Sequence, residues 1–411
     1  MKVLKFGGTS VGSAQRMKDV ARLICTGERS IVVLSAMAGT TNSLVEISDY
    51  LYKKNPDGAN EVINKLAQKY DGHIKELYST DEYRHKAEEL VKSYFDHIRT
   101  FTKDLFTLFE EKVVLAQGEL ISTCMMNLYL NEIGVNSVLI PALDYMRTDK
   151  NAEPDPVYIR ERLLKQLNEH KDADLYITQG YICRNAYGEV DNLQRGGSDY
   201  SASLIGAAVN AEEIQIWTDI DGMHNNDPRI VEHTSPVRNL HFEEAAELAY
   251  FGAKILHPTC ILPAKLNNIP VRLLNTMQPE APGTLISNNT EKGKIKAVAA
   301  KDNITSIKIK SGRMLLATGF LRKVFEIFEN YQTPIDMVTT SEVGVSVTID
   351  NRKHLEEIVD DLKKYGTVTV DEDMVIVCVV GDLEWDNVGF EARIIQALKD
   401  VPVRMISYGG S

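Results

Sequence analysis

The first residues of the chain place a lysine and two glycines at the end of a short apolar segment. Residues 3–6 predict a strand that contains Lys5, and Gly7, Gly8 and Ser10 follow it. Backbone amides in such a turn can bind phosphate oxygens, and the lysine can bring a positive charge to a group being transferred. The order of the residues differs from a Walker A loop and from a dinucleotide fingerprint. A Gly-Gly turn alone is more often structural, so the later motifs decide its meaning.

A second polar segment follows a predicted strand over residues 30–35. Ser35, Ala36 and Thr41 belong to a loop rich in small and hydroxyl residues. Such a loop can bind a carboxylate or a phosphate, although the same residues often only cap a helix.

Glu119 stands among apolar residues and is expected in the first turn of a helix over residues 119–131. The helix dipole stabilises a carboxylate at that position by about 0.3–1 kcal/mol, which is a sufficient structural reason for it. The alternative is that the carboxylate binds a substrate ammonium. The residue alone leaves both interpretations open.

One short cluster carries the strongest signal for a functional site. Arg195, two glycines, Ser198 and Asp199 stand together before a predicted helix over residues 200–210. The planar guanidinium of an arginine can hold a carboxylate through two hydrogen bonds, and glycines let a substrate approach the main chain. Asp199 can orient Lys5 and the acceptor, or hold Mg²⁺ through water. The grouping favours substrate binding over a structural role.

A polar turn after the predicted strand over residues 214–218 suits the sugar and base of a nucleotide. It contains Thr218, Asp219 and His224, and Arg229 follows it.

Lys254 ends a predicted helix over residues 242–254, where a lysine equally well complements the helix dipole. His257 is more simply explained as a structural histidine. The sequence has no HExxH motif and no cluster of cysteines and histidines, so no dedicated metal site is predicted.

The composition indicates a soluble protein with more than one domain. The chain has 411 residues, of which 44% are hydrophobic and 25% charged, and its formal net charge is −12. This length predicts two or three domains, and the negative charge argues against a nucleic-acid partner. The five widely spaced cysteines favour free thiols in a reducing compartment. Without a signal peptide or a run of about eighteen strongly apolar residues, we expect a cytoplasmic protein that does not contact membranes.

Strands alternate with helices over residues 1–292, which predicts an α/β fold, a three-layer αβα sandwich around a largely parallel sheet. The predicted strands span residues 3–6, 30–35, 137–140, 175–178, 214–218 and 271–274. Ligands of such sheets bind beyond the carboxyl ends of the strands, where three of the motifs begin. Residues 50–112 instead have the apolar spacing of amphipathic helices among many charges. We expect a helical insertion there, with charges that serve solubility rather than binding.

The last third of the chain has the order β-α-β-β-α-β over residues 304–371, which is typical of a ferredoxin-like unit. A second copy is predicted from residues 293–303 and 373–411, with a helix over 388–398 and a strand over 403–407. Repetition of such a unit suggests paired regulatory modules. We expect the second copy to be incomplete, because its closing strand and helix are missing.

Taken in order, the motifs resemble those of one family. KFGGTSVG, LSAMAGTTN, GELIS, RTD, RGGSD, WTDIDG with DPR, and FGAKILHP are similar to segments of monofunctional aspartate kinases of the amino-acid kinase superfamily. The resemblance covers essentially the whole chain. It implies an amino-acid kinase domain over residues 1–292 followed by two ferredoxin-like ACT domains. It also implies transfer of the γ-phosphoryl group of ATP to the β-carboxylate of L-aspartate, the first step toward lysine, threonine and methionine.

The resemblance also assigns residue roles. It implies that Lys5 and Asp199 are catalytic. Substrate binding is implied for Ser35, Ala36, Thr41, Glu119, Tyr181, Arg195 and Ser198. ATP binding is implied for Lys5, Gly7, Gly8, Ser10, Thr218, Asp219, His224, Arg229 and Lys254. Many relatives carry tyrosine where His224 stands. An L-lysine effector is implied at Met314, Ala317, Gly319, Phe320, Leu321, Asp336, Thr340, Ser341 and Glu342.

The implied cofactor is ATP with Mg²⁺ held mainly through the phosphates, and the implied assembly is a homodimer or a dimer of dimers through ACT domains. Two other interpretations compete. One is a superfamily kinase for glutamate, acetylglutamate, carbamate or UMP, against which the RGGSD, WTD and FGAK motifs with two ACT modules argue. The other is an amino-acid sensor with an inactive kinase domain, against which the retained Lys5, Glu119, Arg195 and Asp199 argue. Whether lysine, threonine or both inhibit stays open.

Overall fold

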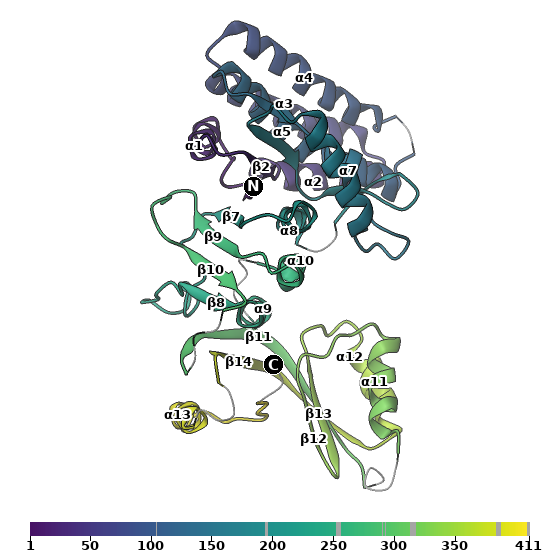
Figure 1. Cartoon of the computed structure of the whole chain (residues 1–411). Coiled ribbons are helices and arrows are strands. Elements are labelled where there is room, and N and C mark those ends of the chain that lie inside the picture. The colour runs from purple at the N-terminus through teal and green to yellow at the C-terminus, as the bar shows by residue number, and fades with distance from the viewer. Residues whose placement is uncertain are drawn as a thin grey trace. The chain divides into compact units, whose positions relative to one another are not determined.

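The computed structural model describes residues 1–103, 105–193, 196–251, 256–289, 291, 293–312, 318–383 and 388–408 (Figure 1). The chain forms two compact units. The first unit comprises Met1–His224, His233–Ala249 and Lys254–Thr290, and the second comprises Asn225–Glu232, Tyr250–Ala253 and Glu291–Ser411.

The first unit contains an eight-stranded sheet in the order β3-β4-β2-β1-β7-β9-β10-β8. Its strands are β1 (Lys2–Phe6), β2 (Ser30–Leu34), β3 (Ser137–Leu139), β4 (Leu175–Gln179), β7 (Ile214–Thr218), β8 (Asn239–His241), β9 (Val271–Asn275) and β10 (Thr284–Ser287). Neighbouring strands from β3 to β9 are parallel, whereas β10 is antiparallel to β9. β2 and β4 are buried along their whole length, as expected for strands covered on both faces. The predicted strands are all present, so the largely parallel sheet is confirmed.

The register places the carboxyl ends of the central strands at one edge of the sheet. Phe6 at the end of β1 lies opposite Leu34 of β2 and Trp217 of β7. Leu34 in turn lies opposite Gln179 at the end of β4. The loops that follow these strands therefore start next to one another, as the motifs require.

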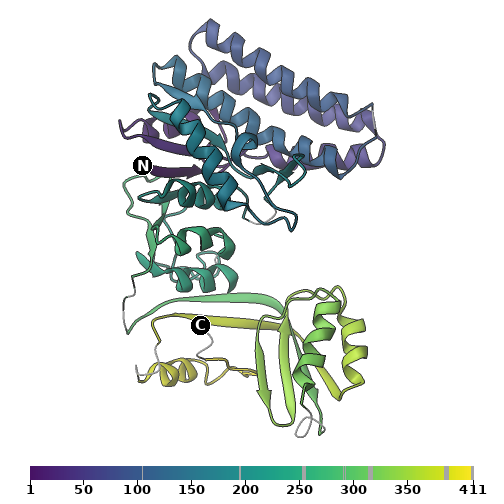
Figure 2. The same cartoon turned by 45° about the vertical axis from the view of Figure 1, so that its right-hand side comes forward.

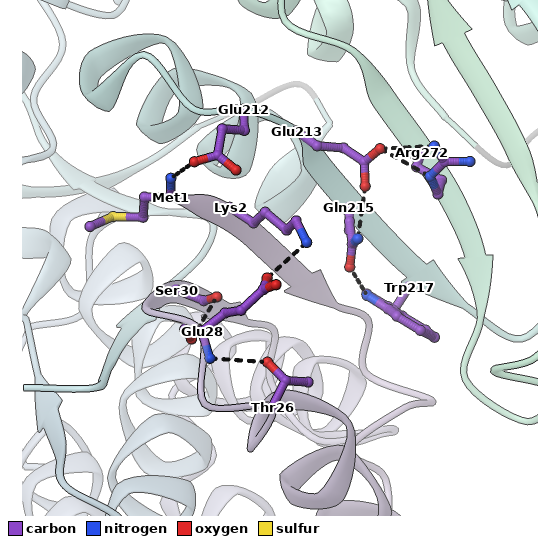
Figure 3. A network of polar contacts seen from close by, with 10 residues as sticks. All are labelled: Met1, Lys2, Thr26, Glu28, Ser30, Glu212, Glu213, Gln215, Trp217 and Arg272. Atoms are coloured by element: carbon purple, nitrogen blue, oxygen red, sulfur yellow. Dashed lines mark hydrogen bonds and ion pairs between the residues drawn. The ribbon is translucent and has the colours of Figure 1, made fainter.

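Charged groups join the strands near the opposite, amino-terminal edge (Figure 3). Lys2 Nζ lies 2.8 Å from a carboxylate oxygen of Glu28, between β1 and the start of β2. Arg272 of β9 contacts Glu213 at 3.0 Å, next to β7. Surface pairs of this kind contribute about 0–1 kcal/mol each, so the buried apolar strands hold the sheet together.

Helices and a small hairpin surround this sheet. They are α1 (Ala14–Ile24), α2 (Thr40–Tyr52), α3 (Pro56–Leu77), α4 (Asp81–Thr100), α5 (Leu108–Glu132), α6 (Ala142–Tyr145), α7 (Pro156–Glu169), α8 (Gly197–Val209), α9 (Phe242–Phe251), the 3₁₀ turn η1 (Pro258–Ile261), α10 (Leu262–Leu266), β5 (Ile182–Arg184) and β6 (Val190–Asn192).

The residues predicted to form a helical insertion, 50–112, contain α3 and α4. Helix α4 packs against α5, and α3 packs against α2 and α4 (Figures 1 and 2). Tyr70 of α3, Phe95 of α4 and Met125 of α5 belong to one apolar core. The insertion is therefore built into the core of the first unit.

The prediction that a helix begins at Glu119 is wrong. Helix α5 begins at Leu108, because Thr107 and Glu110 form a capping box. Glu119 consequently lies in the middle of a long helix, away from its dipole end. Among the described residues, α5 is the one helix with the length and apolarity of a membrane span, and 61% of that apolar window is buried within the protein. Helix α5 is therefore buried to the extent that is typical of a core helix.

The second unit contains a four-stranded sheet in the order β12-β13-β11-β14. Its elements are β11 (Ile295–Lys310), α11 (Phe320–Asn330), β12 (Val338–Ser341), β13 (Gly344–Ile349), α12 (Leu355–Lys363), β14 (Thr367–Gly381) and α13 (Phe390–Ala397). The predicted β-α-β-β-α-β order is present, and both helices contribute to one apolar core with the sheet.

Two details of the second unit differ from the sequence prediction. Residues 295–310 form one strand and residues 367–381 form another, so each crosses a predicted module boundary, between residues 303 and 304 or near residue 372. The two long strands pair with each other through local register shifts. Residues 403–407 form no strand, although the helix predicted over 388–398 is present as α13.

Candidate active site

A cavity of about 560 Å³ opens at the carboxyl edge of the sheet in the first unit. It is lined by Gly8, Thr9, Ser35, Ala36, Met37, Ala38, Gly39, Thr41, Asn42, Glu119, Tyr181, Gly197 and Ser198. These residues come from the loops after β1, β2 and β4, from the starts of α2 and α8 and from the middle of α5. The segments are far apart in the sequence, and the parallel sheet brings them together.

An ion pair joins two of the elements at this edge. Lys5 Nζ, on the central strand β1, lies 2.6 Å from Asp199 Oδ1, and the side chains are only 11% and 16% exposed. Asp199 belongs to the first turn of α8, where the helix dipole favours a negative charge. A Cβ placed on Gly7 would lie 3.6 Å from Lys5 Nζ, so the ammonium lies against the glycine turn. The pair fixes a cation where the sequence predicts a phosphate.

The glycine turn packs closely against the loop that follows β2. A Cβ on Gly8 would lie 2.8 Å from the carbonyl oxygen of Ala36, so only glycine fits there. Ala38 N donates a hydrogen bond to the carbonyl oxygen of Gly8 at 3.1 Å. The glycine turn and the loop that follows β2 thus form one wall of the cavity.

Ser10 lies near this turn but is buried, and its hydroxyl hydrogen-bonds the hydroxyl of Thr276 at 2.7 Å. That contact gives Ser10 a structural role beneath the turn.

Glu119 provides the negative charge of the cavity. Its side chain is 5% exposed, and Oε1 accepts a hydrogen bond of 3.2 Å from the backbone amide of Ala36. Burial raises the pKa of the Glu119 carboxyl to about 7. A carboxylate in this environment gains strongly from an ammonium partner, since pairing offsets its desolvation.

Hydroxyl groups complete this side of the cavity. Ser35 Oγ donates to Ser198 Oγ at 2.9 Å, which connects the loop after β2 to α8. Ser122 Oγ of α5 donates to the carbonyl oxygen of Ser35 at 2.8 Å. A Cβ on Gly180 would lie 2.4 Å from the side chain of Ser198, so glycine allows the end of β4 to approach α8.

Tyr181 has an uncommon backbone conformation beside the cavity. Its φ is +67°, in the left-handed region that a tyrosine seldom adopts. Its amide donates to Ser201 Oγ at 2.8 Å, and its carbonyl oxygen accepts from the amide of Leu193 at 2.8 Å. Burial, helped by Glu119 nearby, raises the pKa of the tyrosine hydroxyl to about 12, so the ring is neutral at physiological pH.

These observations describe a site for an anionic group transferred next to an amino acid. A fixed ammonium faces a glycine turn, a buried carboxylate can bind an amine, and hydroxyl groups and amides can bind a carboxylate.

Comparisons with known proteins agree with this chemistry. The model of the amino acid kinase family matches residues 1–275. Aspartokinase 1 of Arabidopsis thaliana, a chloroplastic enzyme, is 36% identical over 100% of this chain and 75% of its own length. Lysine-sensitive aspartokinase 3 of Escherichia coli is 32% identical over 100% of this chain and 93% of its own length. The crystal structure of E. coli aspartokinase III with aspartate and ADP superposes with a TM-score of 0.82 at 32% identity, covering 100% of this chain and 94% of that one.

The chain belongs to the aspartokinases of the amino acid kinase family.

The structure brings together most of the residues predicted to bind aspartate. Ser35, Ala36, Thr41, Glu119, Tyr181 and Ser198 all line the cavity, with Gly8 from the predicted phosphate turn. Lys5 and Asp199 are paired, and Gly7 lies beside the lysine. Arg195 lies outside the described residues. Sequence reasoning missed Thr9, Met37, Ala38, Gly39, Asn42 and Gly197 as lining residues, although all of them stand inside the motifs that it singled out.

The predicted nucleotide residues are more dispersed. Thr218 Oγ1 donates to Asp219 Oδ1 at 3.2 Å at the end of β7, and His224 Nδ1 contacts Thr234 Oγ1 at 2.8 Å. Arg229 belongs to the second unit and pairs with Asp227 at 2.5 Å. Lys254 lies outside the described residues. Their role in ATP binding stays a prediction.

The predicted effector residues lie in the second unit. Gly319 caps the start of α11 with φ +85°, Phe320 is buried, and Leu321 is partly exposed. Thr340 and Ser341 end β12, and Glu342 follows them. Met314 and Ala317 lie outside the described residues.

Asp336, also predicted to bind the effector, is already paired within the second unit. Its side chain is 1% exposed and lies 3.0 Å from Lys301 Nζ. Tyr250 Oη donates to the same carboxylate at 2.6 Å. Lys301 also contacts Asp350 at 2.8 Å. An effector ammonium at Asp336 would therefore have to share the carboxylate with Lys301.

Proposed function

We propose that the protein transfers the γ-phosphoryl group of ATP to the β-carboxylate of L-aspartate and releases 4-phospho-L-aspartate and ADP. The observation that carries this proposal is the Lys5–Asp199 ion pair, in which Asp199 directly follows Ser198, a residue that lines the cavity together with Glu119. Glu119 would bind the ammonium of aspartate, and the hydroxyl groups of Ser35 and Ser198 would orient its carboxylates.

The reaction fits a site without a strong general base. The acceptor is already an anionic carboxylate, so the main barrier is repulsion between it and the phosphate oxygens. An ammonium about 4 Å from an oxyanion contributes about 4 kcal/mol at an effective dielectric constant near 20. Lys5 is held in place by Asp199, so it does not have to reorganise when charge builds up in the transition state.

ATP would enter as its magnesium complex. Hard oxygen ligands suit Mg²⁺, and the phosphates supply most of them. Asp199 lies beside Lys5 and offers a carboxylate that can reach the ion through water. In the described part of the chain, no three His, Cys, Asp or Glu side chains cluster as a metal site.

Feedback inhibition by L-lysine in the second unit belongs to the same proposal. Its support is the β-α-β-β-α-β order of that unit and the lysine-sensitive relative. Assembly as a dimer or a dimer of dimers, and a cytoplasmic location, stay predictions from the sequence.

The decisive experiment traps the product. The protein is incubated with MgATP, L-aspartate and hydroxylamine, which converts an acyl phosphate to a hydroxamate. Hydroxamate that depends on aspartate, with far less from L-glutamate, and that decreases when L-lysine is added would support the whole proposal. Absence of hydroxamate from a folded protein that binds ATP would favour the inactive sensor.

A further inference from the structure

Two consecutive residues of the helical insertion contact the loop that lines the cavity. Lys69 Nζ, on α3, donates a hydrogen bond to the carbonyl oxygen of Ala38 at 2.7 Å. The hydroxyl of Tyr70 lies 2.9 Å from Thr40 Oγ1, and its ring is completely buried. Neither residue belongs to a motif, and no pattern in the sequence indicates that they approach the cavity.

These contacts reach a part of the loop that is also bound to the glycine turn. Ala38 N already donates to the carbonyl oxygen of Gly8, so its two peptide groups connect the glycine turn on one side to α3 on the other. Gly39, the next residue, has φ +81°, and a Cβ there would lie 3.5 Å from Lys69 Nζ. The ammonium therefore lies directly against the turn that leads from the cavity into α2.

Helix α2 depends on such outside contacts for a fixed start. Its N-cap is Gly39, which has no side chain with which to cap the first amide groups. Tyr70 instead holds Thr40, the first residue of the helix. Because Thr41 lines the cavity one residue later, any movement of this helix start changes the shape of the site.

We propose that Lys69 and Tyr70 are positioning residues for aspartate, through which the helical insertion fixes the loop over residues 36–41. The inference rests on the proposed function, since it concerns the site in which aspartate would bind. It replaces the expectation that the charges of the insertion serve only solubility. Lys69 also adds positive charge beside a loop that would face a substrate with two carboxylates.

Lys65 provides a matched control on the same helix. It lies one turn before Lys69, is exposed, and pairs with Glu61 at 2.7 Å. This is an ordinary surface ion pair within a helix, with little effect expected on anything but local helix stability.

The test compares steady-state kinetics of the full chain and its Lys69→Met, Lys65→Met, Lys69→Arg and Tyr70→Phe variants. For Lys69→Met and Tyr70→Phe we expect the KM for aspartate to rise about five- to tenfold, the order of one hydrogen bond. Their kcat and KM for ATP should stay within about twofold of the unsubstituted chain. Lys69→Arg should recover the KM for aspartate, because a guanidinium can also donate to the Ala38 carbonyl oxygen.

The outcomes separate the two levels of the proposal. If the unsubstituted chain forms no aspartyl phosphate, the proposed function fails, and the inference fails with it. If it is active and Lys69→Met has the same KM for aspartate as Lys65→Met, only the inference is overturned. If Tyr70→Phe lowers both the kcat with aspartate and the thermal stability but leaves the KM for aspartate unchanged, the role of Tyr70 is structural. That result would reject Tyr70 as a positioning residue.

Discussion

At the scale of single residues, the buried carboxyl of Glu119 is the group whose titration is predicted to control substrate binding. Burial raises its pKa to about 7, so the empty site holds a large protonated fraction at neutral pH. The ammonium of aspartate binds only the ionised form well. Binding therefore strengthens as the pH rises through 7 and weakens as the pH falls below it.

The raised pKa of Glu119 predicts how the KM for aspartate depends on pH. Between pH 8 and pH 6 the KM for aspartate should rise about tenfold, in proportion to the loss of the ionised form. A Glu119→Gln variant should have kcat/KM for aspartate about 10- to 100-fold lower at pH 8, the order of a charge-assisted hydrogen bond. Its KM should barely change over the same pH window. Steady-state kinetics at several pH values test this, and a parallel pH response of both proteins would refute the role of Glu119.

The sequence indicated the motif residues around the cavity, but not the residues outside the motifs that contact the cavity loop. Lys5 and Asp199 could be found from the sequence because a lysine after an apolar strand and an acid after two glycines are local patterns. The contacts of Lys69 with Ala38 and of Tyr70 with Thr40 could not, since they depend on how an insertion folds back onto a distant loop.

At the scale of elements, α5 shows why a residue that lines the cavity was placed on the wrong part of a helix. The apolar run around Glu119 suggested a helix start, whereas the capping box at Thr107 begins the helix much earlier. Its Gly118 has a packing role that periodicity does not reveal. A Cβ on Gly118 would lie 2.7 Å from the Cβ of Ala36, a lining residue of the cavity.

Substitution of two helix glycines tests this packing. Gly118→Ala should destabilise the protein by about 1–3 kcal/mol, as overpacking does, and should raise the KM for aspartate because Ala36 is displaced. Gly72→Ala, within α3, is the control, because a Cβ there would meet no atom within 4 Å. It should stabilise the protein by about 0.4–1 kcal/mol, as expected for alanine in a helix. Urea unfolding gives both values, and similar stabilisation by both substitutions would contradict the close contact at Ala36.

Strands were easier to predict than module boundaries. Residues 31–34 and 175–177 are continuous apolar runs, as is typical of buried parallel strands. In the second unit, residues 295–310 form one strand because its two parts pair with β14 across bulges. A sequence pattern shows that each part alternates between apolar and polar residues. It does not show that the two parts pair with the same neighbouring strand and so form one strand.

At the scale of the whole molecule, the two units have separate candidate sites. The cavity proposed to bind aspartate belongs to the first unit, and the residues predicted to bind an effector belong to the second. In the second unit Lys301 supplies an ammonium to Asp336 and to Asp350 at once. An amino-acid effector with its own ammonium would compete for Asp336, and such competition is a means of changing the unit on binding.

Inhibition by L-lysine should therefore depend on Asp336. In an Asp336→Asn variant, the L-lysine concentration for half inhibition, measured against the variant's own uninhibited rate, should rise at least about tenfold. Asp361→Asn is the control, since this partly exposed carboxylate of α12 pairs with Lys364 and Tyr331. It should keep the original sensitivity. Unchanged inhibition of Asp336→Asn would remove Asp336 from the effector site.

Lys5 is proposed to stabilise the phosphoryl group while it is transferred from ATP to aspartate. The most direct measurement is the kcat for hydroxamate formation by Lys5→Ala, compared with Lys2→Ala on the same strand, where the lysine pairs with Glu28 at the other edge of the sheet. Lys5→Ala should lower kcat by about 10²–10³, since the cation acts mainly in the transition state, and the kcat of Lys2→Ala should stay within about twofold of the unsubstituted chain. Near-normal turnover by a folded Lys5→Ala variant would show that Lys5 does not stabilise the transferred phosphoryl group.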